Sequence, residues 1–564
     1  MLNKDTAPLP FWKTLNTATV FASLWLLIFT LYFPAAKAGF VTDFTGWLDQ
    51  VKNHSFSEFV NRTHFEAHSL YQFTQLSTWV FYHIIGVNPW LWHLLFITLH
   101  VVNATLIFHL STRLLSDTGT KNSKLIAYVG VILFTLSPYL SEVVVWEPSY
   151  HFLQGLLFIS LILLLAQSFI NTGKQKYALY ACGIYFISTF TLEAFYLTPW
   201  MVLCLALYYH FSNLVKEGAL KKVVLQFFLP MMALFVIRLI IFKLAYGGWV
   251  SRIGSAPVSE IKLETFGKPA KYLYHLLLMG RFNTFEDRQK AYAFCDSLRG
   301  ILAFYGVAGS IMAVIVFRFK QMGAKGKVAS LLFTWMMISF LLLIPLWFSD
   351  MLLVTFDRYT YFTAPFFYTL LSVLAGYISI DFIRLVILGL YAMVNLRYTI
   401  LVSRYWWKSE KIIHNLITNI PDPGNKTILL LNLPECMNGV PMIGSQKQSE
   451  FKGMHNLLLP EKAIQNLTYD VLSYNMLTPT DGAHVTVLND STVRITLNQW
   501  GTWWWYEGKG AYTYENSVFK ENLVDGGHFY DLILRQPPAN YLLLYQVANE
   551  WKVVDWNKKG VDQK

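Results

Sequence analysis

The sequence predicts a polytopic α-helical membrane protein that carries a small β-rich soluble domain after its last membrane span. Of the 564 residues, 54% are hydrophobic and only 14% are charged, whereas soluble domains carry roughly 25% charged residues. Apolar runs of about 20 residues, the length that crosses a bilayer, recur along the chain. After about Pro421 the pattern changes, because Pro421 and Gly424 interrupt helical periodicity and short β-type runs follow.

About eleven apolar segments are the predicted spans. They lie near residues 18–36, 90–111, 124–140, 151–171, 177–192, 194–212, 222–244, 298–317, 329–348, 359–378 and 381–402. Lys4 and Lys13 precede the first span, which we interpret as a signal anchor that starts inside. An odd number of spans then places the residues after about 403 outside. A ten-span arrangement, without the short fifth segment, would place them inside; the charge bias favours eleven.

The net charge of +11 does not indicate a nucleic-acid-binding protein. Much of the positive charge lies in short connections between spans, which therefore face the cytoplasm. These connections hold Arg113, Lys121, Lys124, Lys174, Lys176, Lys216, Lys221, Lys222, Arg318, Lys320, Lys325 and Lys327. The intervening short connections are mainly acidic, so the two sides of the membrane are distinguished by charge.

Three parts are expected along the chain. Residues 1–403 form the transmembrane domain, with long outer loops at 37–89 and 245–297, and residues 404–423 form a linker. Residues 424–564 form an extracytoplasmic β-rich domain. In the second loop, Lys268–Met279 is predicted as a helix lying on the surface. Strands are predicted at Thr427–Leu431, Val485–Leu488, Val493–Leu497 and Tyr541–Tyr545.

Lone carboxylates at the ends of apolar spans are the first candidate site residues. Asp43, Glu142 and Glu193 all fall on the outer side by helix counting, and Glu147 lies close to Glu142. A carboxylate at a membrane rim can take a proton from a hydroxyl group or hold a divalent cation. The alternatives are a helix cap for Asp43 and water-exposed interfacial residues for Glu142 and Glu147.

Two arginines at outer span ends are candidates for binding a lipid phosphate. Arg238 lies within the seventh predicted span, and Arg358 follows Asp357 at the start of the tenth. Arginine binds phosphate through paired N–H groups. The alternatives are snorkelling to the headgroups for Arg238 and pairing with a carboxylate for Arg358.

Two further patterns leave their alternatives open. His93 and His100 are seven residues apart in the second span, with Asn103 nearby, which is compatible with a metal but favours hydrogen bonding between helices. Trp500, Trp503, Trp504 and Trp505 could stack on sugar rings or belong to the core of the β-rich domain.

Four segments together resemble the transmembrane O-mannosyltransferases that carry C-terminal tetratricopeptide repeats. These enzymes belong to the GT-C class of polyprenyl-phosphate-sugar-dependent glycosyltransferases. The similar segments are Asn88–Leu94 through His100, Ser137–Trp146, Thr191–Ala194 through Pro199, and Asp357–Tyr361. They occur in the family's order over residues 1–400, and Asp43 falls where the family has the first acid of an acidic pair.

The resemblance implies a GT-C-like bundle with an outward-facing site. Asp43 would be the catalytic acid/base, and Glu142 would orient the acceptor or a cation. Arg358 would lie near the donor phosphate, and Arg238 is a second candidate for this role because of its position in the seventh predicted span. Glu193, Glu147, Tyr361 and His151 would contact the acceptor or support the site. The implied partners are a polyprenyl-phosphate-linked sugar, a protein or glycan acceptor and membrane lipid.

The sequence departs from that family at several positions. Phe44 replaces the second acid of the pair, Gln72 stands in a motif where the family has arginine, and residues 149–152 lack a further conserved motif. The β-rich domain takes the place of the repeats. The sequence therefore predicts an inverting glycosyltransferase, with two alternatives: a lipid-linked sugar transporter, or a degenerate GT-C scaffold that only binds a partner.

Overall fold

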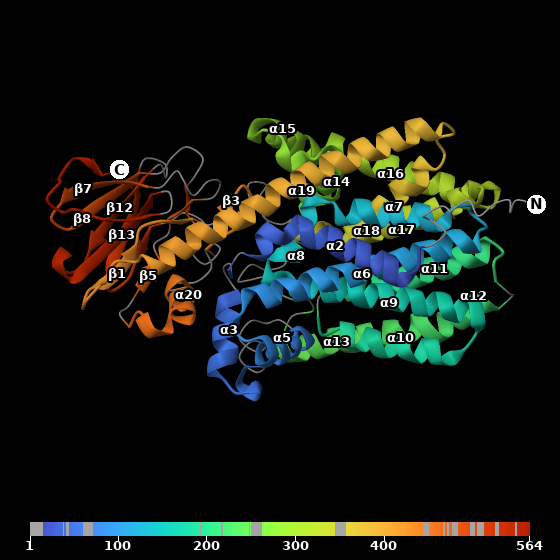
Figure 1. The fold of residues 1–564 in the computed structure, drawn as a ribbon, viewed down its shortest axis with the longest axis horizontal. Helices are drawn as coiled ribbons and strands as arrows, with labels where there is room; N and C mark the ends of the chain where they lie inside the picture. The colour runs from blue at the N-terminus through green and yellow to red at the C-terminus, as the bar shows by residue number, and fades with distance from the viewer. Residues whose placement is uncertain are drawn as a thin grey trace, which may run out of the picture.

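The structure is a computed structural model of residues 1–564, and the residues it describes cover both the helical bundle and the β-rich domain. The described residues are 15–37, 39–40, 44–59, 71–191, 193–215, 218–247, 249, 262–344, 357–434, 436–443, 450–465, 468–470, 473–475, 483–496, 502–504, 513–524, 529–547 and 550–563. Figure 1 shows the helices lying side by side and the β-rich domain beyond one end of them.

Among the described residues, the helical part contains eight helices that are long and apolar enough to cross a membrane. The number is nine if one bent pair of helices counts as a single span. The helices of this part, those long enough to span and shorter ones together, are α2 (Thr17–Ala36), α6 (Pro89–Asp117), α7 (Ser123–Thr135), α8 (Ser141–Val145), α9 (Tyr150–Thr172), α10 (Gln175–Ser188), α11 (Thr198–Phe211), α12 (Ala219–Val223), α13 (Leu229–Tyr246), α16 (Leu298–Arg318), α17 (Ala324–Phe340), α18 (Ala364–Ala375) and α19 (Asp381–Thr418). The prediction of a polytopic helical membrane protein is confirmed.

About eleven spans were predicted, and eight or nine helices among the described residues are long and apolar enough to cross a membrane. Each predicted segment does correspond to a helix or to the bent pair. However, the segments 177–192 and 359–378 correspond to α10 and α18, which have only 14 and 12 residues. A bilayer core needs about 20 helical residues. The helices α10 and α18 therefore fall below the usual spanning length.

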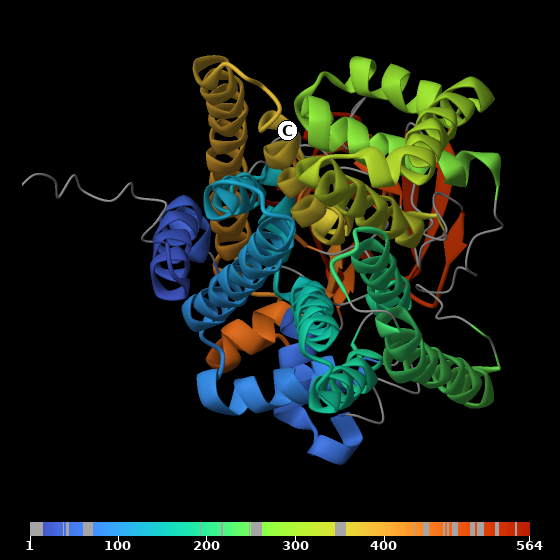
Figure 2. The same ribbon diagram turned by 90° about the vertical axis from the view of Figure 1, so that its right-hand side faces the viewer.

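Burial separates central helices from peripheral ones. In α9, 72% of the most apolar stretch is buried, whereas only 17% is buried in α13, α16 and α19. Figure 2 shows the helices nearly end-on, with α19 at the edge of the group. The exposed apolar faces of the peripheral helices are the surfaces expected to face lipid.

One break in the bundle creates the short helix α8. Helix α7 ends before Ser137-Pro138, and the chain resumes at an angle of 61° in Pro138–Val145. Proline lacks a backbone N–H and disfavours helical geometry in the residue before it, so the sequence itself dictates the bend. Because of this bend, Glu142 lies in a short helix at the end of the bundle.

The two predicted outer loops contain helices of their own. The first includes α3 (Phe44–Asn53) and α5 (Gln72–Ile85), and the second includes α14 (Lys268–Leu278), the turn Gly280–Phe282 and α15 (Phe285–Asp296). Helix α14 was predicted to lie on the surface, but Lys271, Tyr272 and His275 are buried. The reason is local packing, since the His275 ring stacks on Tyr139 from the bent segment at 5.5 Å.

The C-terminal part contains the β-rich domain that the sequence predicted. A four-stranded sheet has the order β14 (Glu550–Val553), β13 (Tyr541–Val547), β1 (Thr427–Leu430) and β5 (Thr468–Asp470), and β1 pairs in parallel with both of its neighbours. A six-stranded antiparallel sheet has the order β10 (Tyr514–Glu515), β11 (Phe519–Val524), β12 (Phe529–Leu534), β8 (Thr492–Thr496), β7 (His484–Asn489) and β15 (Asp562–Gln563). The four predicted strands correspond to β1, β7, β8 and β13.

Helix α19 connects the bundle to the β-rich domain. It runs without a break from Asp381 to Thr418, so much of the predicted linker 404–423 is helical. Figure 1 shows this helix extending from the bundle to the domain. The Trp551 Nε1–H group of β14 donates a hydrogen bond to the Leu416 carbonyl at 2.7 Å.

The β-rich domain also packs against the end of the bundle. Helix α20 (Glu450–Leu458) lies beside α3, as Figures 1 and 2 show. A hairpin of β3 (Cys436–Met437) and β4 (Val440–Pro441) contacts α19. Val440, Met442 and Phe451 belong to the same continuous hydrophobic core as the helices. The two parts therefore share a core at this end of the bundle.

Candidate functional site

Several sequence-predicted residues meet at the end of the bundle that faces the β-rich domain. They come from the bent segment at α8, from the 3₁₀ turn Asp357–Phe362 before α18, from the turn Glu193–Tyr196, and from Tyr71 just before α5. These segments are far apart in the sequence. Their meeting point is the candidate functional site.

Arg358 and Glu142 form an ion pair at this point. The Arg358 guanidinium bonds to Glu142 Oε1, and the Arg358 backbone N–H donates to Oε2 at 2.8 Å. The guanidinium also lies over the Trp146 ring at 5.0 Å and the Tyr359 ring at 5.2 Å from the centroids. The Arg358 side chain is 13% exposed and that of Glu142 is 4% exposed. Burial of a charge requires such partners, so each residue holds the other in place.

Tyr71 and Glu193 form a second polar contact. The Tyr71 hydroxyl donates to the Glu193 carboxylate at 3.1 Å from Oε2, and the Tyr71 ring stacks on His151 at 5.4 Å. Burial raises the pKa of Tyr71 well above its usual range, and the nearby Glu193 charge acts in the same direction. Tyr71 is therefore a neutral hydrogen-bond donor at physiological pH.

These two contacts belong to one group of residues. Tyr359 interacts electrostatically with Glu193 and Glu142. The charge of the neighbouring residue Arg358 interacts electrostatically with His151. We call Tyr71, Glu142, His151, Glu193, Arg358 and Tyr359 the rim cluster. It unites four sequence-predicted residues, namely Glu142, His151, Glu193 and Arg358. Tyr71 entered the sequence analysis only as part of the region around Gln72, and Tyr359 only within a motif.

Asp357, which precedes Arg358 in the chain, connects the rim cluster to a second set of buried polar residues. Its buried carboxylate is bonded to the Arg281 guanidinium, and Oδ1 lies 3.6 Å from His275 Nδ1. Burial lowers the pKa of His275, although the Asp357 carboxylate opposes this effect. Sequence reasoning missed both Arg281 and His275. Both residues lie in a long polar loop. A charged residue is common in such a loop, so nothing in the sequence distinguished them.

Glu147 lies apart from the rim cluster and is fully buried. Its Oε1 is 3.5 Å from His93 Nε2 on α6, and neither carboxylate oxygen has a hydrogen-bond partner among the described residues. The alternative of a water-exposed interfacial residue does not apply to Glu147. The pair connects the start of the segment before α9 with the start of α6.

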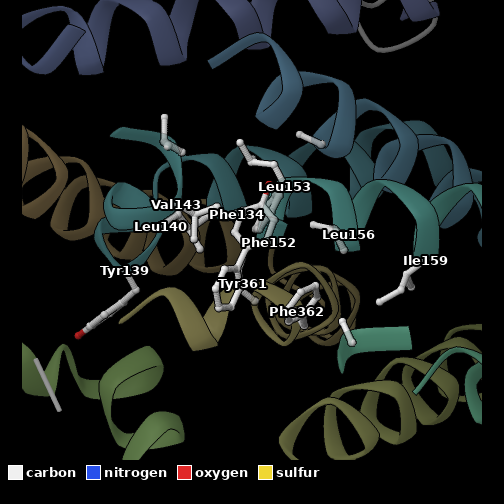
Figure 3. Packing of buried hydrophobic residues seen from close by; sticks show 14 of the residues in the cluster. Phe134, Tyr139, Leu140, Val143, Phe152, Leu153, Leu156, Ile159, Tyr361 and Phe362 are labelled. Carbon is white, nitrogen blue, oxygen red and sulfur yellow. The ribbon is translucent and has the colours of Figure 1, made fainter. Parts of the chain in front are cut away.

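Tyr361 points into the bundle. Its hydroxyl lies 2.9 Å from His100 Nδ1 and accepts a hydrogen bond from Asn103 Nδ2 at 3.1 Å. Figure 3 shows Tyr361 among the buried side chains Phe134, Phe152 and Leu153. His100 was interpreted either as a metal ligand or as a hydrogen-bonding residue between helices. In the structure it forms a hydrogen bond with another segment. Tyr361 holds the Asp357–Phe362 turn against α6, which is a supporting position.

Arg238 is held against the turn that follows α10. Its Nε–H group donates to the Thr189 carbonyl at 2.8 Å, and its guanidinium lies over the Phe190 ring at 4.7 Å. The side chain is buried, so it does not snorkel into solvent. Thr189 lies four residues before Glu193, and the neighbouring Phe190 carbonyl accepts a hydrogen bond from the Phe73 N–H, two residues after Tyr71, at 2.9 Å. Arg238 therefore contacts a turn beside the rim cluster.

Two predictions about the site lie at the limit of the described residues. Asp43 itself is outside them, and Phe44, the next residue, packs its ring 5.0 Å from that of Trp92. Within the described parts of the chain, no three His, Cys, Asp or Glu side chains gather in a way that could hold a metal ion. The role of a divalent cation stays a prediction.

Comparisons with known proteins give structural similarity only. No protein-family model and no curated protein sequence matches the chain. Among solved structures, ArnT from Cupriavidus metallidurans bound to undecaprenyl phosphate has a TM-score of 0.41 and 10% identity, covering 80% of this chain and 89% of that one. The apo state of the same protein has a TM-score of 0.37 and 11% identity, covering 80% and 90%. These similarities are too low to identify a family, so the functional argument rests on the residues.

Proposed function

We propose that this protein is an inverting glycosyltransferase of GT-C type that uses a polyprenyl-phosphate-linked sugar. The observation that carries the proposal is the convergence of the segments that resemble the family. Glu142 and Arg358 belong to two of these segments, lie 216 residues apart in the chain and are directly bonded. Glu193, from a third segment, joins the same rim cluster through Tyr71. The convergence of charged residues from three such segments at one place supports a common site.

Arg358 is the proposed binding residue for the donor phosphate. A buried guanidinium needs an anionic partner, and Glu142 fills that role in the structure described above. A lipid phosphate could bond to the same guanidinium through charge-assisted hydrogen bonds. As the phosphate leaves, Arg358 would offset the negative charge that develops on it. Arg238, beside the rim cluster, is the second candidate for this role.

The proposed reaction exchanges one bond at the sugar's anomeric carbon. The acceptor hydroxyl oxygen attacks this carbon from the side opposite the phosphate, and the bond from the carbon to the phosphate oxygen breaks. The lipid phosphate departs with the bonding electron pair. Asp43, assigned by the family resemblance, takes the acceptor's proton. Glu142 would orient the acceptor once the phosphate has engaged Arg358, and Glu193 and His151 would line the site beside it.

The site and the β-rich domain are proposed to lie on the outer side of the membrane. The basic connections between spans favour a cytoplasmic location for the opposite end of the bundle. The β-rich domain packs on the same end as the rim cluster. It is therefore placed to present or select a protein or glycan acceptor.

The proposal is tested by sugar transfer in membranes that contain the protein. A panel of labelled polyprenyl-phosphate sugars is added, and labelled product is measured for the wild type and for Asp43→Asn. The substitution keeps the shape of the side chain but removes its basic oxygen. We expect the variant to lose about 10²–10⁴-fold in rate while its affinity for the donor changes little.

The control variant is Asp381→Asn, because Asp381 is exposed at the start of α19 and pairs only locally with Arg384 among the described contacts. It should transfer sugar at the wild-type rate. Near-wild-type transfer by Asp43→Asn would exclude Asp43 as the base and make Glu142 the next candidate. Loss of both transfer and donor binding would instead indicate a metal or folding role for Asp43.

A lipid-binding scaffold without transfer activity is the second candidate function. Two observations favour it: Arg358 already has a carboxylate partner, and Phe44 stands where the similar family has its second acid. Saturable binding of polyprenyl phosphate without transfer from any donor in the panel would support the scaffold. Movement of the labelled lipid between leaflets of reconstituted vesicles would support a transporter.

A further inference from the structure

Arg281 connects the β-rich domain to the rim cluster through one side chain. Its Nη1 bonds to the Asp357 carboxylate, and its Nη2–H group donates to the Asn438 carbonyl at 2.7 Å. The Arg281 side chain is only 4% exposed and that of Asp357 only 1%. The two terminal nitrogens of this buried guanidinium group therefore bond to different parts of the protein, one to the bundle and the other to the β-rich domain.

Arg281 itself is held firmly. It lies in the turn Gly280–Phe282, and its own carbonyl accepts a hydrogen bond from Arg288 Nη1 at 3.0 Å. A Cβ atom at Gly280 would come within 2.1 Å of the Tyr274 ring, so the turn can approach that ring only with glycine here. The Phe282 ring stacks on Tyr398 of α19 at 3.9 Å. The turn thus presents Arg281 in one position.

The Asn438 carbonyl is also presented by a defined turn. Asn438 and Gly439 join β3 to β4 with φ angles of 49° and 83°, the left-handed conformation that Asn and Gly tolerate best. Met437 and Val440 on either side are buried in the core shared with the helices. The hairpin therefore bonds to Arg281 through its turn while its flanking side chains are packed in the core that the bundle and the β-rich domain share.

Asp357 transmits this contact to Arg358 because the two residues are adjacent. The Asp357 carbonyl accepts a hydrogen bond from Thr360 Oγ1 at 2.8 Å, which closes the turn that carries both residues. The Arg358 backbone N–H is the group that donates to Glu142. A displacement of Asp357 would therefore move both the backbone and the guanidinium of Arg358.

We infer that Arg281 is a positioning residue that couples docking of the β-rich domain to the placement of Arg358. The coupling is a property of the fold, and its effect on donor binding rests on the proposed function. It follows that the β-rich domain completes the phosphate-binding site through Arg281, in addition to any contact it makes with an acceptor.

The experiment uses the full-length protein in lipid nanodiscs and two pairs of variants. Arg281→Met removes both bonds, whereas Arg281→Lys keeps the charge but replaces the fork with a single ammonium group. Asn438→Val strains the left-handed turn, whereas Asn438→Gly tolerates it. Arg384→Met, at an exposed local pair, is the control for loss of an arginine. Amide hydrogen exchange is measured for peptides covering residues 357–362 and 436–443, together with binding of labelled polyprenyl phosphate.

We expect Arg281→Met and Asn438→Val to accelerate exchange in both peptides, including that of the Arg358 amide, by about tenfold or more. Donor affinity should fall about tenfold to a hundredfold in parallel. Arg281→Lys should not restore the slow exchange of residues 357–362. Asn438→Gly and Arg384→Met should behave as the wild type.

Faster exchange at 436–443 with unchanged exchange at 357–362 would overturn the coupling. Full restoration by Arg281→Lys would overturn it as well, since charge alone would then suffice. Coupled exchange in a protein that never binds polyprenyl phosphate would leave the positioning of Arg358 supported and contradict the proposed function. Exchange therefore tests this inference without any donor, and lipid binding by the wild type tests the function.

Discussion

Arg358 is tied to Glu142 by both its side chain and its backbone, and this double contact decides how a substitution there will act. Arg358→Ala removes the guanidinium but leaves the backbone N–H bond to Glu142 available. A charge-assisted contact to phosphate is worth roughly 1.5–3 kcal/mol. We expect affinity for polyprenyl phosphate to fall tens-fold or more, measured by binding to the purified variant, while the helical bundle stays assembled.

The matched control for this prediction is Arg384→Ala, which removes an arginine that is 31% exposed and pairs with Asp381 one turn earlier in the same helix. Unchanged affinity in Arg358→Ala would leave Arg358 as the partner of a structural ion pair. The phosphate-binding role would then pass to Arg238, which lies beside the rim cluster.

At the residue scale, the sequence revealed those charges that interrupt apolar segments. Glu142, Glu193 and Arg358 were predictable because a charge at a span end is costly and therefore conspicuous. Arg281 and His275 were not, because a charge in a polar loop has no such cost. Their importance comes from being buried against Asp357, and burial of a loop is a tertiary property.

At the element scale, close helix contacts depend on single small residues. A Cβ atom at Gly130 on α7 would lie 2.9 Å from the Thr369 Cα on α18, whereas one at Gly183 on α10 would meet nothing within 4 Å. We expect Gly130→Ala to destabilise the bundle by about 1–3 kcal/mol, because α7 and α18 must move apart. Gly183→Ala should be neutral or stabilising by about 0.5–1 kcal/mol, because alanine favours the helix.

The measurement is the thermal midpoint of unfolding of both variants in the same detergent. The two substitutions add the same methyl group to a helix, so intrinsic helix propensity cannot explain a difference between them. Equal midpoints would show that α7 and α18 are not packed as closely as described.

Helix α19 continues beyond the end of the predicted span at residue 402. After residue 402 the sequence becomes more polar, and the span was predicted to end there. Yet Val402, Trp406, Ser409, Ile413 and Leu416 are buried at alternating spacings of four and three residues. This periodicity is typical of an amphipathic helix and was available in the sequence. In α19, the continuous apolar run up to residue 402 predicts the membrane-spanning part. The spacing of the apolar residues after it predicts that the helix continues toward the β-rich domain.

At the scale of the whole molecule, the long helix separates the β-rich domain from the membrane interior. The 38 residues of α19 span about 57 Å at 1.5 Å per residue, and a bilayer core is about 30 Å thick. We expect protease added to right-side-out vesicles to remove the β-rich domain. A cysteine introduced at exposed Lys121 should react with an impermeant reagent only in inverted vesicles.

Cleavage of the domain only in inverted vesicles would contradict this topology, and with it the proposed side of catalysis. The cysteine at position 121, in a background without the native cysteines, reports on the opposite end of the bundle. Protease cleavage of the domain and labelling of the cysteine at position 121 must therefore give opposite results in the same vesicle preparation.

The arrangement of the whole β-rich domain was the least predictable from sequence. The individual strands were recognisable as short apolar runs, but their partners are remote. Strand β1 pairs in parallel with β13 and with β5, and no local turn could reveal this register. Likewise, the packing of the β3–β4 hairpin against Arg281 depends on contacts between separate parts of the chain.

The pairing of β1 with β13 also sets the order in which the protein can mature during synthesis. Asn432, just after β1, exchanges hydrogen bonds with Gln546, 114 residues later in the chain. The ribosome delivers β1 early, but its partner strand emerges only after almost all of the domain has been translated. Until then the apolar residues Ile428–Leu430 lack their β13 neighbour, and we expect this unpaired strand edge to need protection by chaperones. A chain halted before β13 would already contain the β3–β4 hairpin that bonds to Arg281, but it would lack the strand that pairs with β1.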